Sequence, residues 1–137
     1  MIANTSHLPV ALVVEDDDKL ATIFTSALNL AGFDVRHAVN GRQAMDQVNS
    51  LMPAIVLLDL HLPEVSGDKI LHYIRSADRL KDMVIILATA DSAMADSLEE
   101  KADFVLQKPI SFTQLRDLAI RIRSTLRPNP NPPPTDR

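Results

Sequence analysis

The 137-residue sequence contains no cysteine, only three glycines and no long hydrophobic run. The absence of cysteine excludes disulfides, thiolate catalysis and cysteine-type zinc sites. The three glycines, Gly32, Gly41 and Gly67, do not form the glycine-rich turn after a first strand that a nucleotide-binding α/β domain needs. No apolar stretch approaches the roughly 20 residues that span a bilayer, and the first residues lack the basic and apolar regions of a signal peptide. We therefore expect a cytoplasmic protein that does not contact a membrane.

A basic surface is also missing, because 14 lysine and arginine residues are opposed by 18 aspartate and glutamate residues, for a formal net charge of -4. Proteins that bind nucleic acids usually have a basic excess, so we expect no direct contact with nucleic acid. The length predicts a single domain. We expect it at residues 9–127, after a flexible lead-in at 1–8 and before a proline-rich, disordered tail at 128–137, with no effector domain beyond the tail.

Five short apolar runs predict five β-strands, at residues 10–14, 33–39, 54–58, 83–88 and 104–106. Apolar residues at helical spacing predict a helix after each strand, with stripes at 20–31, 44–51, 70–74, 93–101 and 115–126. The first helix is expected to start at Lys19 and to have Gly32 as its C-cap. Ser111 and Gln114 form a capping box before the last helix. The fourth helix, which Asp91 can cap, has the thinnest apolar stripe.

Strands that alternate with helices are joined by right-handed crossovers, which give a parallel sheet with helices on both faces. We therefore predict an α/β fold with a doubly wound, flavodoxin-like sheet of five parallel strands in the order 2-1-3-4-5. In that order the first and third strands are neighbours at the topological switch point, and the ligand crevice lies at their carboxyl ends.

Polar residues stand at the carboxyl ends of four of these strands. Glu15 and Asp16 follow the first strand, Asp59 the third, Thr89 the fourth and Lys108 the fifth. Three carboxylates so close together repel one another unless one is protonated or a divalent cation binds, and Mg²⁺ suits a site of this kind. The ammonium of Lys108 can pair with Asp59 or with a phosphoryl oxygen, and the Thr89 hydroxyl can donate one hydrogen bond. A carboxylate nucleophile beside Mg²⁺, an ammonium and a hydroxyl is what phosphoryl transfer requires.

Each of these residues also has a purely structural interpretation. Lys108 could be a solvated strand end, Thr89 could cap the next helix, and Asp17 and Asp18 are best explained as caps of the first helix. However, the structural interpretations would all have to be true at once, for residues that lie at the same edge of the sheet. The joint interpretation as a phosphoryl-transfer site is therefore favoured.

These motifs closely resemble the receiver domain of bacterial two-component response regulators. The resemblance covers residues 9–127 and includes VVED after the first strand, LLDLHLPEVSG around Asp59, Thr-Ala after the fourth strand and Lys-Pro after the fifth. It implies that Asp59 accepts a phosphoryl group from a phosphohistidine on a sensor histidine kinase or a histidine phosphotransfer protein. It also implies the site residues: Glu15, Asp16, Asp59 and the backbone carbonyl of His61 for Mg²⁺, and Thr89 and Lys108 for the phosphoryl group.

By the same resemblance, the chain would catalyse its own phosphotransfer and a slow autodephosphorylation without being a conventional enzyme. Phosphorylation would switch contacts with a downstream protein effector, and the domain would be a monomer or a weak homodimer. His61 and Asp91, which flank the approach of the attacking water in the family, could tune the lifetime of the phosphate. The switch position, typically aromatic in the family, is Val105 here, and Phe104 is expected on the opposite face of the strand.

Three other functions compete with this interpretation. A phosphatase of the haloacid dehalogenase type also has a nucleophilic aspartate after an apolar strand, but its motif needs a second aspartate two residues later, where this chain has His61. A phosphorylation-independent interaction module of the receiver type stays open, although the intact acids, Thr89 and Lys108 weigh against it. A receiver severed from a hybrid histidine kinase also stays open, because the proline-rich tail does not argue against it.

Overall fold

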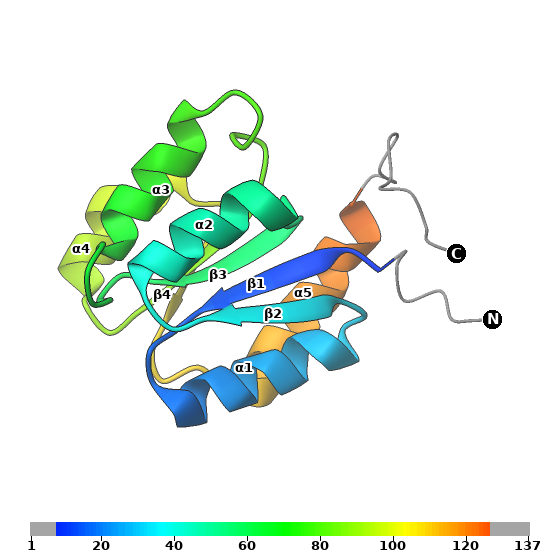
Figure 1. The fold of residues 1–137 in the computed structure, drawn as a ribbon. Helices are drawn as coiled ribbons and strands as arrows, with labels where there is room; N and C mark the ends of the chain where they lie inside the picture. Colours follow the sequence, from blue (N-terminus) through cyan, green and yellow to red (C-terminus); the bar gives the residue numbers. More distant parts are fainter. Residues whose placement is uncertain (1–7, 127–137) are drawn as a thin grey trace.

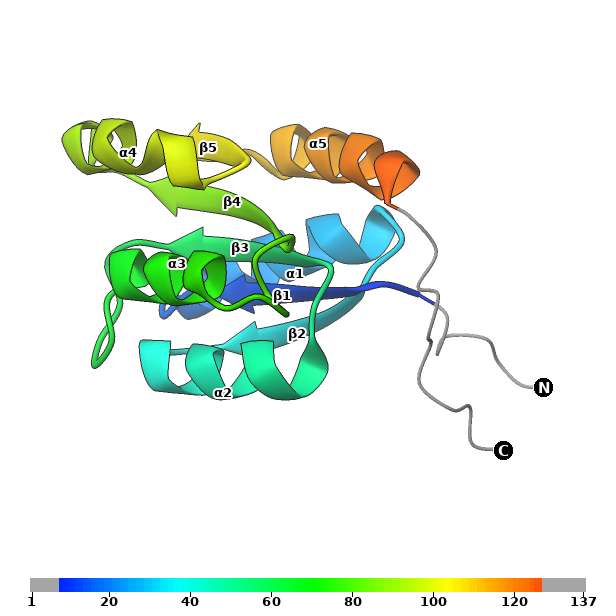
Figure 2. The ribbon, with the colours of Figure 1, turned by 90° about the horizontal axis from the view of Figure 1, so that it is seen from above.

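The computed structural model describes residues 8–126, and these residues adopt the predicted α/β fold. Five parallel strands form one sheet in the order β2-β1-β3-β4-β5, which can be followed in Figure 2. The strands are β1 (Val10–Val14), β2 (Asp34–Ala38), β3 (Ile55–Asp59), β4 (Val84–Thr89) and β5 (Phe104–Gln107). The α-helices are α1 (Asp18–Leu30), α2 (Gly41–Leu51), α3 (Gly67–Ser76), α4 (Ser92–Leu98) and α5 (Phe112–Thr125), and one 3₁₀ turn spans Glu99–Lys101. The predicted tail, and the lead-in up to residue 7, lie outside the described residues.

Every strand begins and ends within one residue of its prediction. A bilayer crossing needs a long apolar helix, and residues 8–126 contain none. Side-chain caps set the start of four helices, among them α1 and α5. Asp17 accepts the N–H of Leu20 at 3.0 Å and starts α1 one residue before the predicted Lys19. Ser111 accepts the N–H of Gln114 at 3.0 Å and starts α5, which confirms that half of the capping box.

Two helix ends differ from the prediction. The C-cap of α1 is Ala31 and not Gly32, which follows it with a φ of 101°, in the left-handed region that favours glycine. The predicted fourth helix was too long, because α4 ends at Leu98 and the chain continues to Lys101 as a 3₁₀ turn. Only Ala95 of α4 is buried, so this helix has little packing to extend it.

The sheet separates two hydrophobic clusters. One lies between the sheet and helices α1 and α5, and the other between the sheet and helices α2, α3 and α4 (Figure 1). Along β3, Ile55 and Leu57 enter the first cluster, whereas Val56 and Leu58 enter the second. All four are at most 2% exposed, and full burial of such a side chain stabilises a fold by about 1.5–3 kcal/mol. A slip by one residue would exchange the two faces, so the register that leaves Asp59 at the end of β3 is strongly fixed.

Gly67 holds the start of α3 against the end of β3. Its N–H donates to the carbonyl of Leu60 at 3.0 Å. A Cβ at this position would overlap the carbonyl oxygen of Asp59 and lie 2.6 Å from the Cα of Leu60. Glycine is therefore required here, because the helix passes directly over the backbone that carries Asp59.

We predict that Gly67→Ala lowers the free energy of unfolding by about 1–3 kcal/mol, the usual cost of overpacking. The added Cβ would meet backbone atoms of residues 59 and 60, which cannot move aside as a flexible side chain could. Urea denaturation measures the change. Ser26→Ala, on the exposed side of α1, is the control and should change stability by less than about 0.5 kcal/mol. Equal stability of Gly67→Ala and the wild type would contradict this close packing.

Candidate functional site

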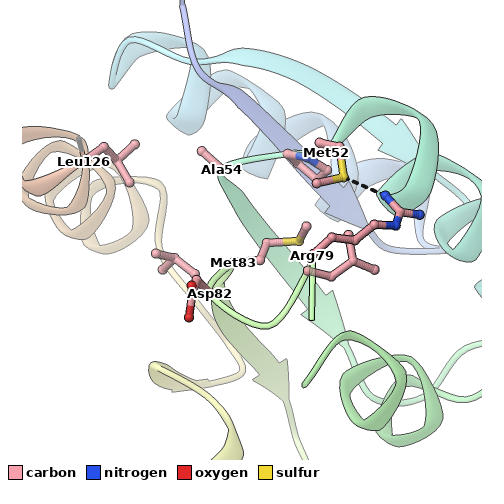
Figure 3. A pocket seen from close by; sticks show the side chains of 9 residues that line it. Met52, Ala54, Arg79, Asp82, Met83 and Leu126 are labelled. Atoms are coloured by element: carbon pink, nitrogen blue, oxygen red, sulfur yellow. Dashed lines mark hydrogen bonds between the residues drawn. The ribbon is translucent and has the colours of Figure 1, made fainter. Parts of the chain in front are cut away.

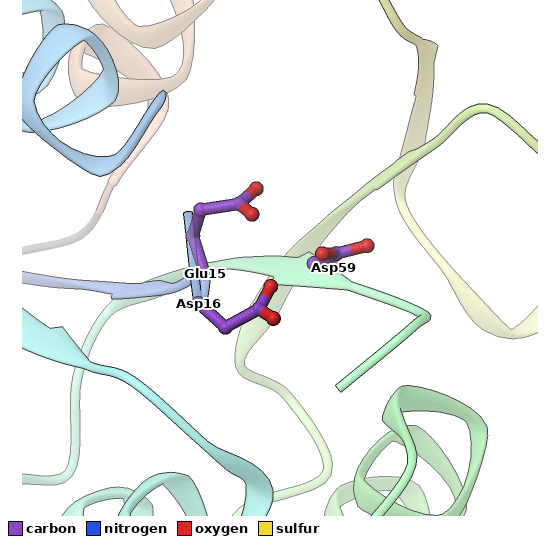
Figure 4. Close-up of side chains that lie close together, drawn as sticks. All are labelled: Glu15, Asp16 and Asp59. Carbon is purple, nitrogen blue, oxygen red and sulfur yellow. The ribbon is translucent and has the colours of Figure 1, made fainter. Parts of the chain in front are cut away.

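Three carboxylates meet at the carboxyl ends of β1 and β3 (Figure 4). Glu15 directly follows β1, and Asp59 is the last residue of β3, which pairs with β1. One oxygen from each of Glu15, Asp16 and Asp59 lies within 4.8 Å of the other two. Glu15 is 2% exposed and Asp59 is 5% exposed, whereas Asp16 is open to solvent. The fold therefore assembles the predicted acidic cluster and buries two of its three members.

Lys108 brings a positive charge to this cluster. Its Nζ lies 2.9 Å from Oε1 of Glu15 and 3.5 Å from Oδ2 of Asp59. The backbone N–H of Lys108 donates to the backbone carbonyl of Thr89 at 2.9 Å. This hydrogen bond joins the end of β5 to the end of β4. The lysine thus contacts both buried carboxylates, whereas the sequence predicted a pair with Asp59 or with a phosphoryl oxygen.

Burial and charge oppose each other in the cluster. Burial is the main reason why the pKa of Glu15 is raised; the hydrogen bond from Lys108 opposes this rise and the negative charge of Asp59 adds to it. Burial acts to lower the pKa of Lys108, but its hydrogen bond to Glu15 and the charges of both carboxylates outweigh burial, and the pKa is raised. Lys108 is therefore an ammonium at neutral pH. It contacts two of the three carboxylates, so with all three ionised the cluster has an excess of negative charge.

The donor set of the cluster fits a small, hard cation. Mg²⁺ binds a few carboxylate oxygens and keeps several of its waters. Here two of the carboxylates are buried and the third is exposed, so the cluster offers protein oxygens at a position that water can reach. The cluster includes no histidine or cysteine side chain, the ligands that softer metals select. Glu15, Asp16 and Asp59 are the residues that could hold Mg²⁺.

Thr89 lies beside the carboxylates at the end of β4. Asp59 is in register with Ala88, so Thr89 comes directly after the neighbour of Asp59. Thr89 is fully buried, and its Oγ1 accepts the N–H of Asp91 at 3.0 Å. Asp91 is the cap of α4, because its carboxylate accepts the N–H of Met94 at 3.0 Å. Thr89 is therefore not the helix cap that its structural interpretation required.

His61 and Asp91 form an exposed pair beside Asp59. Nε2 of His61 lies 3.7 Å from Oδ2 of Asp91, and the N–H of His61 donates to Oδ1 of Asp59 at 3.1 Å. The pair joins the loop after β3 to the start of α4. The ligand role of the His61 carbonyl, and an effect of the pair on the lifetime of a phosphate, stay predictions.

Val105 and Phe104 face opposite sides of β5. Val105 packs into the cluster beneath α2, α3 and α4, and Leu106 into the cluster beneath α1 and α5. Because side chains alternate along a strand, Phe104 lies on the side of Leu106, and it is 38% exposed. Phe104 therefore cannot substitute for an aromatic residue at the position of Val105.

His37 of β2 also contacts the site, through the backbone carbonyl of Glu15. It is half-buried on β2, and its Nε2 lies 2.7 Å from the carbonyl oxygen of Glu15. No motif signals this contact, because it is made to a backbone atom. It depends on the register between β1 and β2, which pairs Val13 with His37.

A hollow of about 250 Å³ lies at the opposite end of the sheet (Figure 3). Met52 and Pro53 line it before β3 starts, Met83 before β4 starts, and Leu126 after α5 ends. The strands are parallel, so these residues lie away from the carboxyl ends where the carboxylates meet. None of the predicted site residues lines this hollow.

The sequence matches the model of one protein family, the response regulator receiver domain, over residues 11–120. The DNA-binding response regulator MtrA of Mycobacterium tuberculosis (strain ATCC 25618 / H37Rv) is 37% identical over 123 residues, which cover 89% of this chain and 52% of MtrA. This chain spans about half the length of the curated relatives it matches. MtrA is named for DNA binding, and the absence of nucleic-acid contact expected for this chain stays a prediction.

The solved structures with a similar fold include two with a TM-score of 0.78. A putative response regulator from Chloroflexus aurantiacus J-10-fl has a TM-score of 0.78 and 27% identity, covering 85% of this chain and 98% of that chain. The signal receiver domain of a signal transduction histidine kinase from Syntrophus aciditrophicus also has a TM-score of 0.78 and is 25% identical. The match covers 88% of this chain and 94% of that chain. Similar domains are thus found both in a response regulator and in a histidine kinase.

We predict that Lys108→Met destabilises the protein in metal-free buffer. Removing one partner of a fully buried ion pair costs about 3–5 kcal/mol, and because the Lys108 side chain is 19% exposed we expect about 1–3 kcal/mol. The cost arises because Glu15 and Asp59 lose the ammonium between them. Urea denaturation with a chelator present measures it.

Lys81→Met is the matched control for this variant. Nζ of Lys81 lies 3.8 Å from Oδ1 of Asp78, and both side chains are largely exposed. Its loss should cost less than about 0.5 kcal/mol. Similar costs for the two variants would mean that Lys108 does not hold the cluster together.

Proposed function

Because the chain belongs to the response regulator receiver domain family, we propose that it accepts a phosphoryl group on Asp59 from a phosphohistidine of a partner protein. The partner is a sensor histidine kinase or a histidine phosphotransfer protein. The observation that carries the proposal is the surroundings of Asp59: a nearly buried carboxylate with an ammonium 3.5 Å away and two further acids beside it. Such a carboxylate is oriented as a nucleophile, and the neighbouring groups can manage the charge that arrives with a phosphoryl group.

In the proposed reaction an oxygen of Asp59 attacks the phosphorus atom of the phosphohistidine. The new O–P bond forms as the P–N bond breaks, and the imidazole of the partner leaves with the electron pair of that bond. Lys108 neutralises negative charge on the phosphoryl oxygens from its position between Glu15 and Asp59. Thr89 donates its hydroxyl hydrogen, which its bond with the N–H of Asp91 does not use.

Mg²⁺ is the proposed cofactor, held by Glu15, Asp16 and Asp59, with the backbone carbonyl of His61 as a further ligand. When bound, Mg²⁺ supplies positive charge for the phosphoryl oxygens. The three carboxylates give the site its affinity for the ion, and the excess of negative charge in the cluster supports this assignment.

The proposed output is a change in contacts with a downstream protein, transmitted through α4. Thr89 accepts the N–H of Asp91, and Asp91 caps α4. If the Thr89 hydroxyl turns toward a phosphoryl group, the bond to Asp91 changes and the start of α4 responds. This route needs no aromatic side chain at Val105, the position where the family usually has one.

A receiver that forms part of a hybrid histidine kinase is the second candidate. The observation in its favour is the similarity to the receiver domain of the Syntrophus aciditrophicus kinase. The size of the native protein, measured by immunoblotting in its source cells, distinguishes a separate receiver from a receiver within a hybrid kinase. A band at the size of a kinase supports the second candidate, and a band near 15.1 kDa supports a separate receiver.

We predict that acetyl phosphate and Mg²⁺ add one phosphoryl group to the wild type and none to Asp59→Asn. The adduct should be stable in acid and labile in base, as expected for an acyl phosphate. Intact-mass spectrometry measures it. Asp96→Asn, which changes an exposed aspartate of α4, is the control and should be phosphorylated like the wild type. A wild type without an adduct, or equal adducts on wild type and Asp59→Asn, would contradict the proposal.

A further prediction concerns the metal. Mg²⁺ should raise the thermal unfolding temperature of the wild type, because a ligand at 100 times its Kd stabilises the folded state by about 2.7 kcal/mol. Glu15→Gln removes one of three carboxylates and should need at least about tenfold more Mg²⁺ for the same rise. Glu100→Gln removes the same charge from an exposed position and should behave like the wild type. Equal Mg²⁺ requirements for both variants would exclude Glu15 as a ligand.

A further inference from the structure

The backbone N–H and the backbone carbonyl of Glu15 both form hydrogen bonds with β2, to Ala38 and His37 respectively. The N–H of Glu15 donates to the carbonyl of Ala38 at 3.1 Å. The carbonyl oxygen of Glu15 lies 2.7 Å from Nε2 of His37. A carbonyl oxygen can only accept a hydrogen bond, so Nε2 carries the hydrogen and donates it.

The imidazole acts at the point where the backbone pairing of β1 with β2 ends. That pairing runs to Ala38, after which the chain turns toward α2. Val39 gives its N–H to Oε1 of Gln43 at 3.0 Å, and Asn40 is the N-cap of α2. Because the backbone of β2 leaves the sheet here, a side chain of the strand supplies the hydrogen bond to Glu15.

The carbonyl that His37 contacts belongs to the planar peptide unit between Glu15 and Asp16. Fixing the direction of this carbonyl therefore fixes the backbone orientation from which both acidic side chains extend. Their carboxylates must remain close to each other and to Asp59 against mutual repulsion. His37 is itself held from α2, because Nε2 of Gln47 donates to the His37 carbonyl at 3.4 Å.

We propose that His37 is a positioning residue of the acidic site, which aligns the peptide between Glu15 and Asp16 so that both carboxylates bind Mg²⁺ together with Asp59. This inference rests on the proposed function, because it assigns His37 to the Mg²⁺ site of that function. Groups that orient metal ligands through hydrogen bonds, without touching the metal themselves, typically contribute about 10–100-fold to metal affinity. His37 acts on a backbone carbonyl and not on a ligand atom, so its effect belongs at the lower end of that range.

Calorimetric titration of Mg²⁺ into the wild type and three variants tests the proposal. His37→Leu removes the donor and should weaken Mg²⁺ binding about 10-fold. His37→Gln carries an amide N–H the same number of bonds from Cα as Nε2 of histidine, so its affinity should stay within about threefold of the wild type. His72→Leu removes an exposed histidine of α3 and is the matched control, with unchanged affinity expected.

A purely structural role would lower the stability of both His37 variants without separating their Mg²⁺ affinities, so urea denaturation accompanies the titrations. If His37→Leu does not fold, His37→Thr replaces it, because threonine suits a strand but is too short to reach the carbonyl. Unchanged affinity in the folded variant, or no recovery in His37→Gln, overturns the role of His37 while the proposed function stands. A wild type that binds no Mg²⁺ overturns both.

One measurement does not depend on the metal. NMR spectra of the metal-free wild type, recorded above neutral pH, should find the ring hydrogen of His37 on Nε2, the tautomer that the bond to Glu15 requires. A ring hydrogen on Nδ1 with Nε2 bare overturns the proposal, whatever Mg²⁺ affinity is measured.

Discussion

Electrostatic repulsion among Glu15, Asp16 and Asp59 is the physical constraint on which the rest of the site depends. Two of these carboxylates are nearly buried, and burial raises the pKa of Glu15. They remain together because β1 and β3 are neighbours, covered by helices on both faces, and their register is fixed by hydrophobic packing. Lys108 offsets part of the repulsion from the end of β5. A phosphoryl group is itself an anion, so it can approach Asp59 favourably only when further positive charge compensates the cluster.

The ends of the strands also connect this charged cluster to the surface. Thr89 is buried beside Asp59, yet its hydroxyl oxygen bonds to the N–H of Asp91, the residue that caps α4. Only one residue of α4 is buried, so the helix is held by few core contacts and its position can respond to small changes at its start. The packed centre of the sheet thus fixes the carboxylates, and the loosely packed α4 is the element that the proposed output would move.

The sequence predicted the fold well because each strand has a strong local signal, an apolar run that ends in turn residues. That Glu15, Asp59 and Lys108 lie close together could be predicted from the strand order, since parallel strands end at one edge. Features that depend on three-dimensional register were not predictable. His37 has no sequence motif, because it bonds to a backbone carbonyl of a neighbouring strand. The end of α4 was also missed, because helical spacing continues beyond Leu98 although the packing that would sustain a helix does not.

Chemical mapping of the phosphorylated protein tests the proposal that Asp59 itself becomes the acyl phosphate. Borohydride reduces an aspartyl phosphate to homoserine and releases the phosphate, so the modified position can be read by peptide sequencing in a mass spectrometer. We predict homoserine at position 59 after treatment with acetyl phosphate, Mg²⁺ and borohydride, and unmodified aspartate at position 16. Homoserine at position 16, or at another acid in place of position 59, would contradict the assignment of Asp59 as the phosphoacceptor.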